Sequence, residues 1–161
     1  MKRILTLSLL IALAATSVYS AQAAKPDFSG AWKFDPAKSD FGQAPPPEAL
    51  ALIVVHKEPA VKITSTQTAQ GTTTVNERNI TTDGKPNANR LKSAMGDQDV
   101  TSTSKWVGAA LQTSYTLQIQ GTPIPTVETW ELNSPKLMTI TRKLTLPDAS
   151  ELIIKVVYNK Q

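Results

Sequence analysis

Cysteine is absent from the 161 residues of this chain, and histidine occurs once, as His56. Without cysteine the protein has no disulfide framework, and it lacks the lipidated cysteine that tethers a bacterial lipoprotein. A single histidine also falls short of a zinc site, which takes three or four clustered ligands. We expect His56, at the end of a predicted strand beside Lys57 and Glu58, to be a partly exposed side chain without a catalytic or metal-binding role.

Catalytic motifs are missing as well. The chain has no Gly-x-Ser-x-Gly elbow and no glycine-rich phosphate loop. Two carboxylates, Glu128 and Glu131, flank Trp130, but the alternation of a strand places them on opposite faces, where they cannot act as an acid–base pair. Asp97 and Asp99 can share a face, yet no third ligand accompanies them. We therefore expect a protein that is not an enzyme and that holds no cofactor and no metal.

Basic residues are in slight excess but do not cluster. The formal net charge is +4, and two of the positive charges come from Lys2 and Arg3 at the start of the chain. The other lysines and arginines are scattered singly, whereas a nucleic-acid-binding surface needs a basic patch. Nucleic acid is therefore not an expected partner.

One long apolar run is present, at residues 4–15. It follows the basic pair Lys2-Arg3 and precedes Ala21-Gln22-Ala23, which is the order of a secretory signal peptide. The run is shorter than the roughly 20 apolar residues that cross a bilayer. We predict a signal peptide over residues 1–23, one mature domain over residues 24–161 without a membrane anchor, and export to the periplasm or the medium.

Short segments of alternating apolar and polar residues fill the rest of the sequence. In the clearest, residues 111–119, a period of two puts one set of side chains in the core and the other in water. Eight further segments are predicted strands: 28–34, 50–56, 61–68, 72–81, 100–107, 127–132, 137–145 and 152–158. Short turns link them, and such links join antiparallel neighbours. The sequence predicts an all-β, antiparallel meander of about eight to ten strands that closes into a barrel.

Two segments do not fit this pattern. Residues 36–47 include Pro45-Pro46-Pro47, which cannot donate ladder hydrogen bonds, so we expect an extended surface loop there. Residues 85–95 are compatible with one helical turn around residues 88–94 or with a loop, because Pro86 and the asparagines disfavour regular structure.

The strings Phe28-Ser-Gly-Ala-Trp-Lys-Phe34, Trp106-Val-Gly108, Glu128-Thr-Trp-Glu-Leu132, Met138-Thr-Ile-Thr-Arg142 and Val157-Tyr-Asn-Lys-Gln161 run through the mature chain. Together they resemble a family of exported, lipocalin-like bacterial proteins of unknown function. The first string carries the Gly-x-Trp pattern that opens the first strand of calycins, the lipocalins and fatty-acid-binding proteins. The resemblance implies a calycin-type barrel and supplies no activity.

In calycins the tryptophan of this pattern lies at the closed end of the barrel, and in lipocalins an arginine from a late strand packs across it. The resemblance therefore gives Gly30 and Trp32 a structural role. It makes Arg142 the candidate for the arginine, and exposure of Arg142 to solvent near a strand end is the alternative.

Fatty-acid-binding proteins hold the ligand carboxylate with an Arg-x-Tyr pair on the last strand. Tyr158 matches the tyrosine, but Val156 stands in the place of the arginine, so this clamp is incomplete. If an acid binds, Arg142 or Arg78 has to supply the charge.

Two functions compete. The first is binding of a small apolar or amphipathic molecule inside the barrel, since strands rich in threonine leave the interior loosely filled. Its expected lining residues are Tyr115, Leu117, Trp130, Ile140, Arg142 and Tyr158. The alternative is a filled barrel that binds or inhibits a protein of the cell envelope, with residues 36–47 as the recognition segment. An open interior of roughly a few hundred cubic ångströms favours the first function.

Overall fold

The computed structural model describes residues 25–93 and 96–161. The predicted signal peptide and its cleavage site lie outside these ranges. Ten strands and one short 3-10 helix, η1 (Pro36–Lys38), make up the described chain. The strands are β1 (Gly30–Phe34), β2 (Ala49–Lys57), β3 (Ala60–Ala69), β4 (Thr72–Thr81), β5 (Asp83–Leu91), β6 (Gln98–Val107), β7 (Ala110–Ile119), β8 (Thr122–Ser134), β9 (Leu137–Thr145) and β10 (Glu151–Lys160).

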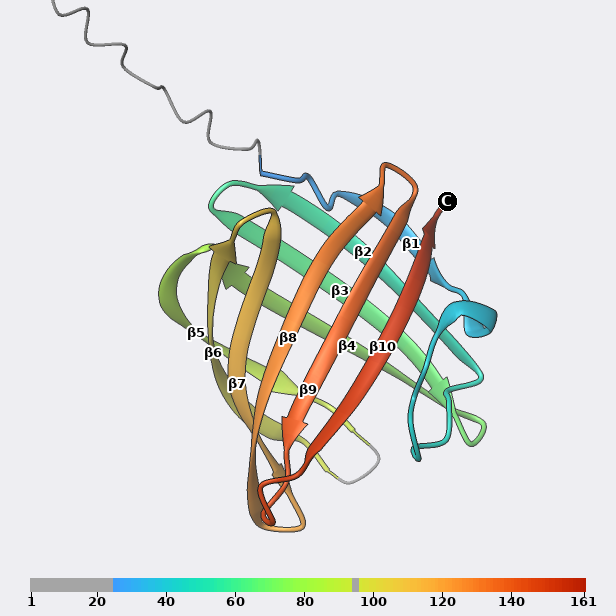
Figure 1. Ribbon diagram of the computed structural model, residues 1–161, viewed down its shortest axis with the longest axis vertical. Helices are drawn as coiled ribbons and strands as arrows, with labels where there is room; N and C mark the ends of the chain where they lie inside the picture. The colour runs from blue at the N-terminus through green and yellow to red at the C-terminus, as the bar shows by residue number, and fades with distance from the viewer. Residues whose placement is uncertain (1–24, 94–95) are drawn as a thin grey trace, which may run out of the picture.

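The strands form an antiparallel meander that curls into a nearly closed barrel (Figure 1). Their order across the sheet is β4-β3-β2-β1-β10-β9-β8-β7-β6-β5, so the first strand pairs with the last. In that pairing Trp32 lies opposite Lys160 and Phe34 opposite Tyr158. The predicted all-β meander is confirmed. Among the described residues, no helix is long and apolar enough to cross a membrane.

One strand was not predicted. β5 occupies most of the segment for which the sequence allowed a helical turn or a loop, and that expectation is wrong. Pro86 and the asparagines are poor strand formers, but from Pro86 to Leu91 the chain pairs with β6, so tertiary pairing overrides the local preference. β5 also lies at one end of the strand order, where a residue without an N–H group is tolerated.

Two hairpins have tight turns with two consecutive residues at positive φ. Gln70 and Gly71 connect β3 to β4 with φ values of 51° and 71°, and Gln120 and Gly121 connect β7 to β8 with φ values of 52° and 77°. Two central residues with positive φ match the twist of the flanking strands, and glycine adopts that conformation without steric cost.

The segment after β1 is only partly the surface loop that was expected. The main chain of Asp35 and Asp40 continues along β10, through bonds to Val157 and Lys155. Phe41 then turns inward and packs edge-on against Phe34, with ring centroids 5.7 Å apart. Pro47 is buried. The triple proline therefore belongs to a segment that crosses one end of the barrel.

Large aromatic side chains close the other end. Phe28, Trp32 and Trp130 are each at most 1% exposed and belong to one apolar core. The indole N–H of Trp32 donates to the carbonyl of Phe28 at 2.9 Å. The N-terminal segment is thereby fixed across the barrel end, next to the chain's C-terminus (Figure 1).

Gly30 is required where β1 begins. Its φ is +137°, and a Cβ at this position would stand 2.5 Å from Cε of Lys160. We expect Gly30→Ala to lower the free energy of unfolding by about 2 kcal/mol, mainly through backbone strain, because Cε of Lys160 belongs to a flexible side chain that can move away from the added carbon. The matched control is Gly108→Ala, where φ is +61° and no atom lies within 4 Å of the added carbon. There we expect a loss of about 1 kcal/mol. Equal losses in urea unfolding would show that the backbone at Gly30 is no more strained than that at Gly108.

Candidate ligand-binding cavity

A cavity of about 380 Å³ occupies the barrel interior. The strand pattern explains its lining, because alternate residues of β7, β8, β9 and β10 point to the same side of the sheet. Among the lining residues are all six that the sequence suggested for a ligand: Tyr115, Leu117, Trp130, Ile140, Arg142 and Tyr158. The structure thus brings together side chains that are up to 43 positions apart in the chain.

The rim of the cavity is formed by irregular segments and strand ends. Phe41, Pro45 and Pro47 come from the segment that crosses this barrel end, whereas Lys92 follows β5 and Gln98 is the first residue of β6. The rim is therefore mixed in character, with apolar groups on one side and polar groups on the other.

A buried carboxylate, Glu128, lies at the centre of the cavity wall. Its side chain is 1% exposed and both of its oxygens are used. Oε1 accepts from Arg78 at 2.9 Å and from the indole N–H of Trp130 at 2.8 Å. Oε2 accepts from Nη2 and Nε of Arg142 at 2.7 and 3.2 Å, and from the Tyr115 hydroxyl at 3.3 Å. We call Glu128 with Arg78 and Arg142 the charged cluster.

The charged cluster keeps Glu128 ionised. Burial by itself would raise the pKa of this carboxyl, but the positive charges of Arg78 and Arg142 and its hydrogen bonds outweigh burial and hold the pKa far below the usual range. Burial raises the pKa of the neighbouring Tyr115 hydroxyl, which therefore stays neutral. Two guanidinium groups and one carboxylate leave the cluster with one net positive charge.

The two arginines differ in how much they face the cavity. The side chain of Arg78 is 15% exposed, whereas that of Arg142 is 40% exposed and borders the cavity. A guanidinium carries five N–H donors, and Arg142 uses two of them on Glu128. Arg142 can therefore donate to a bound molecule without releasing its carboxylate partner.

The expected contact between Arg142 and Trp32 is wrong, whereas the alternative, exposure of Arg142, holds in part, since this side chain is 40% exposed. The cation over the Trp32 ring is Lys160, whose Nζ lies 5.3 Å from the ring centroid. Arg142 instead turns into the barrel, because a buried carboxylate attracts it more strongly than an aromatic face. Lys160 reaches Trp32 since the two residues are paired across β1 and β10.

Sequence reasoning missed Glu128. From the sequence, Glu128 was considered only as an acid–base partner of Glu131. The two residues do lie on opposite faces of the strand, since Glu131 is exposed. The overlooked signal is the alternation of β8 itself, in which Thr126, Glu128 and Trp130 occupy the inward positions. A carboxylate in an inward series predicts a buried positive partner.

Tyr158 lines the cavity next to Val156 on β10, so the incomplete Arg-x-Tyr pair does face the interior. Burial raises the pKa of Tyr158. Among the described residues its hydroxyl has no hydrogen-bond partner. It is therefore a second polar group, besides Arg142, that is available to a molecule in the cavity.

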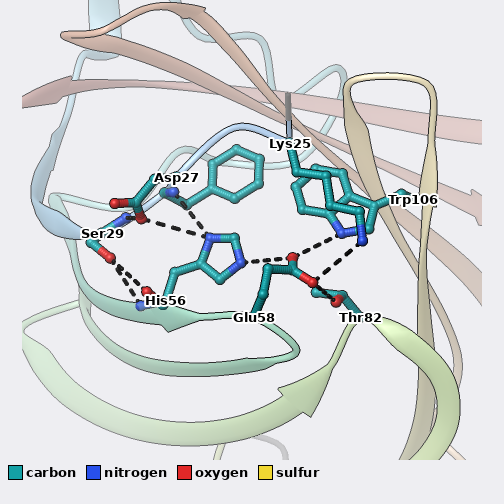
Figure 2. A network of polar contacts seen from close by, with 8 residues as sticks. Lys25, Asp27, Ser29, His56, Glu58, Thr82 and Trp106 are labelled. Carbon is teal, nitrogen blue, oxygen red and sulfur yellow. Dashed lines mark hydrogen bonds and ion pairs between the residues drawn. The ribbon is translucent and has the colours of Figure 1, made fainter. Parts of the chain in front are cut away.

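A second polar cluster lies at the opposite end of the barrel (Figure 2). The carboxylate of Glu58 accepts from Thr82 at 2.7 Å and from the indole N–H of Trp106 at 2.9 Å, and it contacts Lys25 at 3.4 Å. These bonds, with that to His56, outweigh partial burial and lower the pKa of Glu58. The cluster fixes strand ends and the N-terminal segment to one another.

His56 is part of this cluster, and the expectation of a partly exposed side chain is wrong, because its imidazole is only 3% exposed. The ring stacks on Phe28 with centroids 5.9 Å apart. Nδ1 accepts from the Phe28 amide at 3.3 Å, and Nε2 pairs with Glu58 at 3.0 Å. With both ring nitrogens engaged, His56 serves to hold the N-terminal segment in place.

Within residues 25–93 and 96–161, no three histidine or acidic side chains gather so that they could hold a metal ion. Comparison with protein-family models gives no match to this chain, and no curated protein matches it in sequence. Its function has to be argued from the cavity itself.

Proposed function

We propose that the protein binds a small amphipathic molecule with one negative charge inside its barrel. The observation that carries this proposal is the combination of an open interior with a charged cluster of net positive charge in its wall. Binding sites for small molecules are mostly apolar concave spaces in which a few polar groups set the orientation.

The apolar part of the cavity supplies the driving force. Leu117, Trp130, Ile140 and Ile154 contribute apolar surface to the lining. Each square ångström of apolar ligand surface removed from water stabilises the complex by about 25 cal/mol, from which the cost of association is subtracted. A compact hydrocarbon or aromatic group is therefore suited to this space.

The charged cluster favours an acidic ligand over a neutral or basic one. Glu128 neutralises only one of its two arginines, and the exposed donors of Arg142 face the cavity. A carboxylate or sulfonate group on Arg142, with the Tyr158 hydroxyl as a further donor, would bring the cluster to neutrality. A hydrogen bond between charged groups in such a site is stronger than a neutral one.

The alternative function, a filled barrel that acts through its surface, receives less support. That function was expected to go with a filled interior, and the interior of this barrel is open. The calycin likeness and export from the cytoplasm also remain proposals. The ten-stranded meander and the burial of Trp32 in the first strand support the likeness to calycins.

A matched pair of dyes tests the proposal. Anilinonaphthalene sulfonate carries one negative charge, and phenylnaphthylamine is the same ring system without the sulfonate. We expect saturable binding of the sulfonate to the folded protein, weakened at least tenfold by Arg142→Met, as expected for the loss of about 1.4 kcal/mol or more. Binding of the neutral dye should change little, and Arg90→Met, an exposed arginine, serves as the control.

A cavity-filling variant locates the bound dye. Leu117→Trp places a larger side chain at a lining position that is only partly buried, and we expect it to abolish binding of both dyes. No saturable binding to the parent protein, or binding unaffected by Leu117→Trp, would contradict the proposal.

A further inference from the structure

The two edges of the sheet face each other across a seam. β4 and β5 follow one another in the chain but stand at opposite ends of the strand order, and no main-chain ladder joins them in the described structure. Every other pair of consecutive strands, from β1 and β2 to β9 and β10, is joined by such a ladder. The barrel is therefore interrupted along one line.

Asparagine side chains bridge this seam in place of the ladder. Oδ1 of Asn89 accepts from the amide of Asn79 at 2.7 Å, and its Nδ2 donates to the Asn79 carbonyl at 3.1 Å. Asn76 makes the same pair of bonds with Lys92, at 2.6 Å to the amide and 3.0 Å to the carbonyl. Each carboxamide thus pairs with both main-chain groups of one residue, as an opposing strand residue would.

The seam is fixed at one end and meets the cavity at the other. Where β4 turns into β5, Thr82 is buried and bonded through its amide to Pro59 and through its hydroxyl to Glu58. At the far end both partners of the second bridge, Asn76 and Lys92, line the cavity. The seam can therefore separate from the cavity end while the turn remains in place.

Separation would lead directly to the charged cluster. Arg78 follows Asn76 on β4 at the next position of the same face, and it lines the cavity and holds Glu128. The four bonds of the two bridges lie at exposed groups, where water can replace each of them. A fifth bond across the seam is part-buried and runs from Nδ2 of Asn87 to the Thr81 hydroxyl at 3.2 Å. On the neighbouring side of β4, ten residue pairs join it to β3.

From this arrangement we infer that the seam between β4 and β5, which ends at the cavity rim, separates to let the ligand enter and leave the cavity, and that Asn76, Asn87 and Asn89 hold it shut. The inference rests on the proposed function. It predicts that Asn87 and Asn89, neither of which lines the cavity, govern the rates of binding and release and leave the equilibrium affinity nearly unchanged.

The first test removes the bridges. In Asn87→Ala/Asn89→Ala, which removes the bonds across the seam that lie outside the cavity, we expect the association and dissociation rates of anilinonaphthalene sulfonate, measured by stopped flow, to rise together about tenfold. The dissociation constant should stay within about threefold of that of the parent protein, since a route that opens more often speeds both directions equally. A change in affinity without a parallel change in both rates would contradict the inference.

The second test locks the seam. Because the chain has no native cysteine, Asn79→Cys/Asn89→Cys supplies a unique thiol pair that dibromobimane can link. We expect the linked protein to bind and release the dye at least tenfold more slowly than the same variant with both thiols capped. The control is the pair Thr64→Cys/Glu77→Cys, which links β3 to β4 where a ladder already exists.

The outcomes separate the two proposals. If the parent protein binds no dye, the proposed function fails and the entry route fails with it. If the parent binds the dye and the protein linked across β4 and β5 exchanges it at the rate of the capped protein, only the entry route is overturned.

Discussion

Glu128→Gln should lower the free energy of unfolding by about 3–5 kcal/mol, a large share of the roughly 5–15 kcal/mol that stabilises a domain. The substitution keeps the shape of the side chain but removes its charge. Arg78 and Arg142 would then stand in the barrel interior as two unpaired cations, although both now bond to this carboxylate. Urea unfolding followed by tryptophan emission measures the loss.

Two comparisons show whether the lost charge pairing causes the effect. Glu131→Gln changes an exposed carboxylate three positions away and should alter stability by less than about 0.5 kcal/mol. Replacing the whole cluster by methionine, in Arg78→Met/Glu128→Met/Arg142→Met, should recover most of the loss, because no uncompensated charge remains. A triple variant as unstable as Glu128→Gln would argue against this explanation.

The effect of Glu128→Gln should also depend on pH. The pKa of Glu128 in the folded protein is far below its usual value, so its stabilising contribution is complete above the ordinary carboxyl range and is lost as the pH falls toward the folded-state pKa. The stability difference between the parent protein and Glu128→Gln should therefore shrink between about pH 5 and pH 3. A difference that grows on acidification would contradict the assignment of the charge.

Trp32→Ala is expected to cost about 3–5 kcal/mol through the cavity that it leaves in the core. The ring is 1% exposed, and its N–H group is bonded to the carbonyl of Phe28. The substitution therefore removes packing and one buried hydrogen bond at the closed end of the barrel. An unfolding midpoint close to that of the parent protein would show that this end contributes little to stability.

Lys160→Met separates the packing of Trp32 from its contact with a cation. The ammonium group lies 5.3 Å from the ring centroid, and such contacts at accessible sites contribute about 0.5–1 kcal/mol. We expect a loss of this size for Lys160→Met. A loss as large as that of Trp32→Ala would instead assign the stabilisation to the cation.

Most of the fold was predictable because buried and more exposed residues alternate along most of its strands. The boundaries of β4 and β9 were predicted without error, and most other predicted strands differ from the observed ones by one or two residues at their ends. The exception is β8, of which the predicted strand at residues 127–132 covers fewer than half of the residues. β5 was not predicted, because the asparagines of this edge strand use their side chains in place of main-chain partners across the sheet edge. A strand-propensity scale takes no account of such bonds from the asparagine side chain.

The candidate site was predictable in its apolar part and obscure in its charged part. Period-two alternation suffices to place Tyr115 and Trp130 on inward faces. It cannot tell which distant strands meet, and so it could not show that Arg78 reaches across 50 positions to Glu128. A buried charge needs a partner of opposite charge, and which residues become partners is determined only when the strands come together in the barrel.

The pairing of β1 with β10 bears on the order of events during folding. All other ladders in the described chain join strands that are consecutive in sequence, and each of these hairpins can form as soon as its two strands exist. The ring closes only when β10 is inserted between β1 and β9, where Gln161 also bonds to Ala31. A chain that emerges N-terminus first therefore remains an open, incomplete sheet until its final strand is available, and the interior that we assign to a ligand does not exist before that moment.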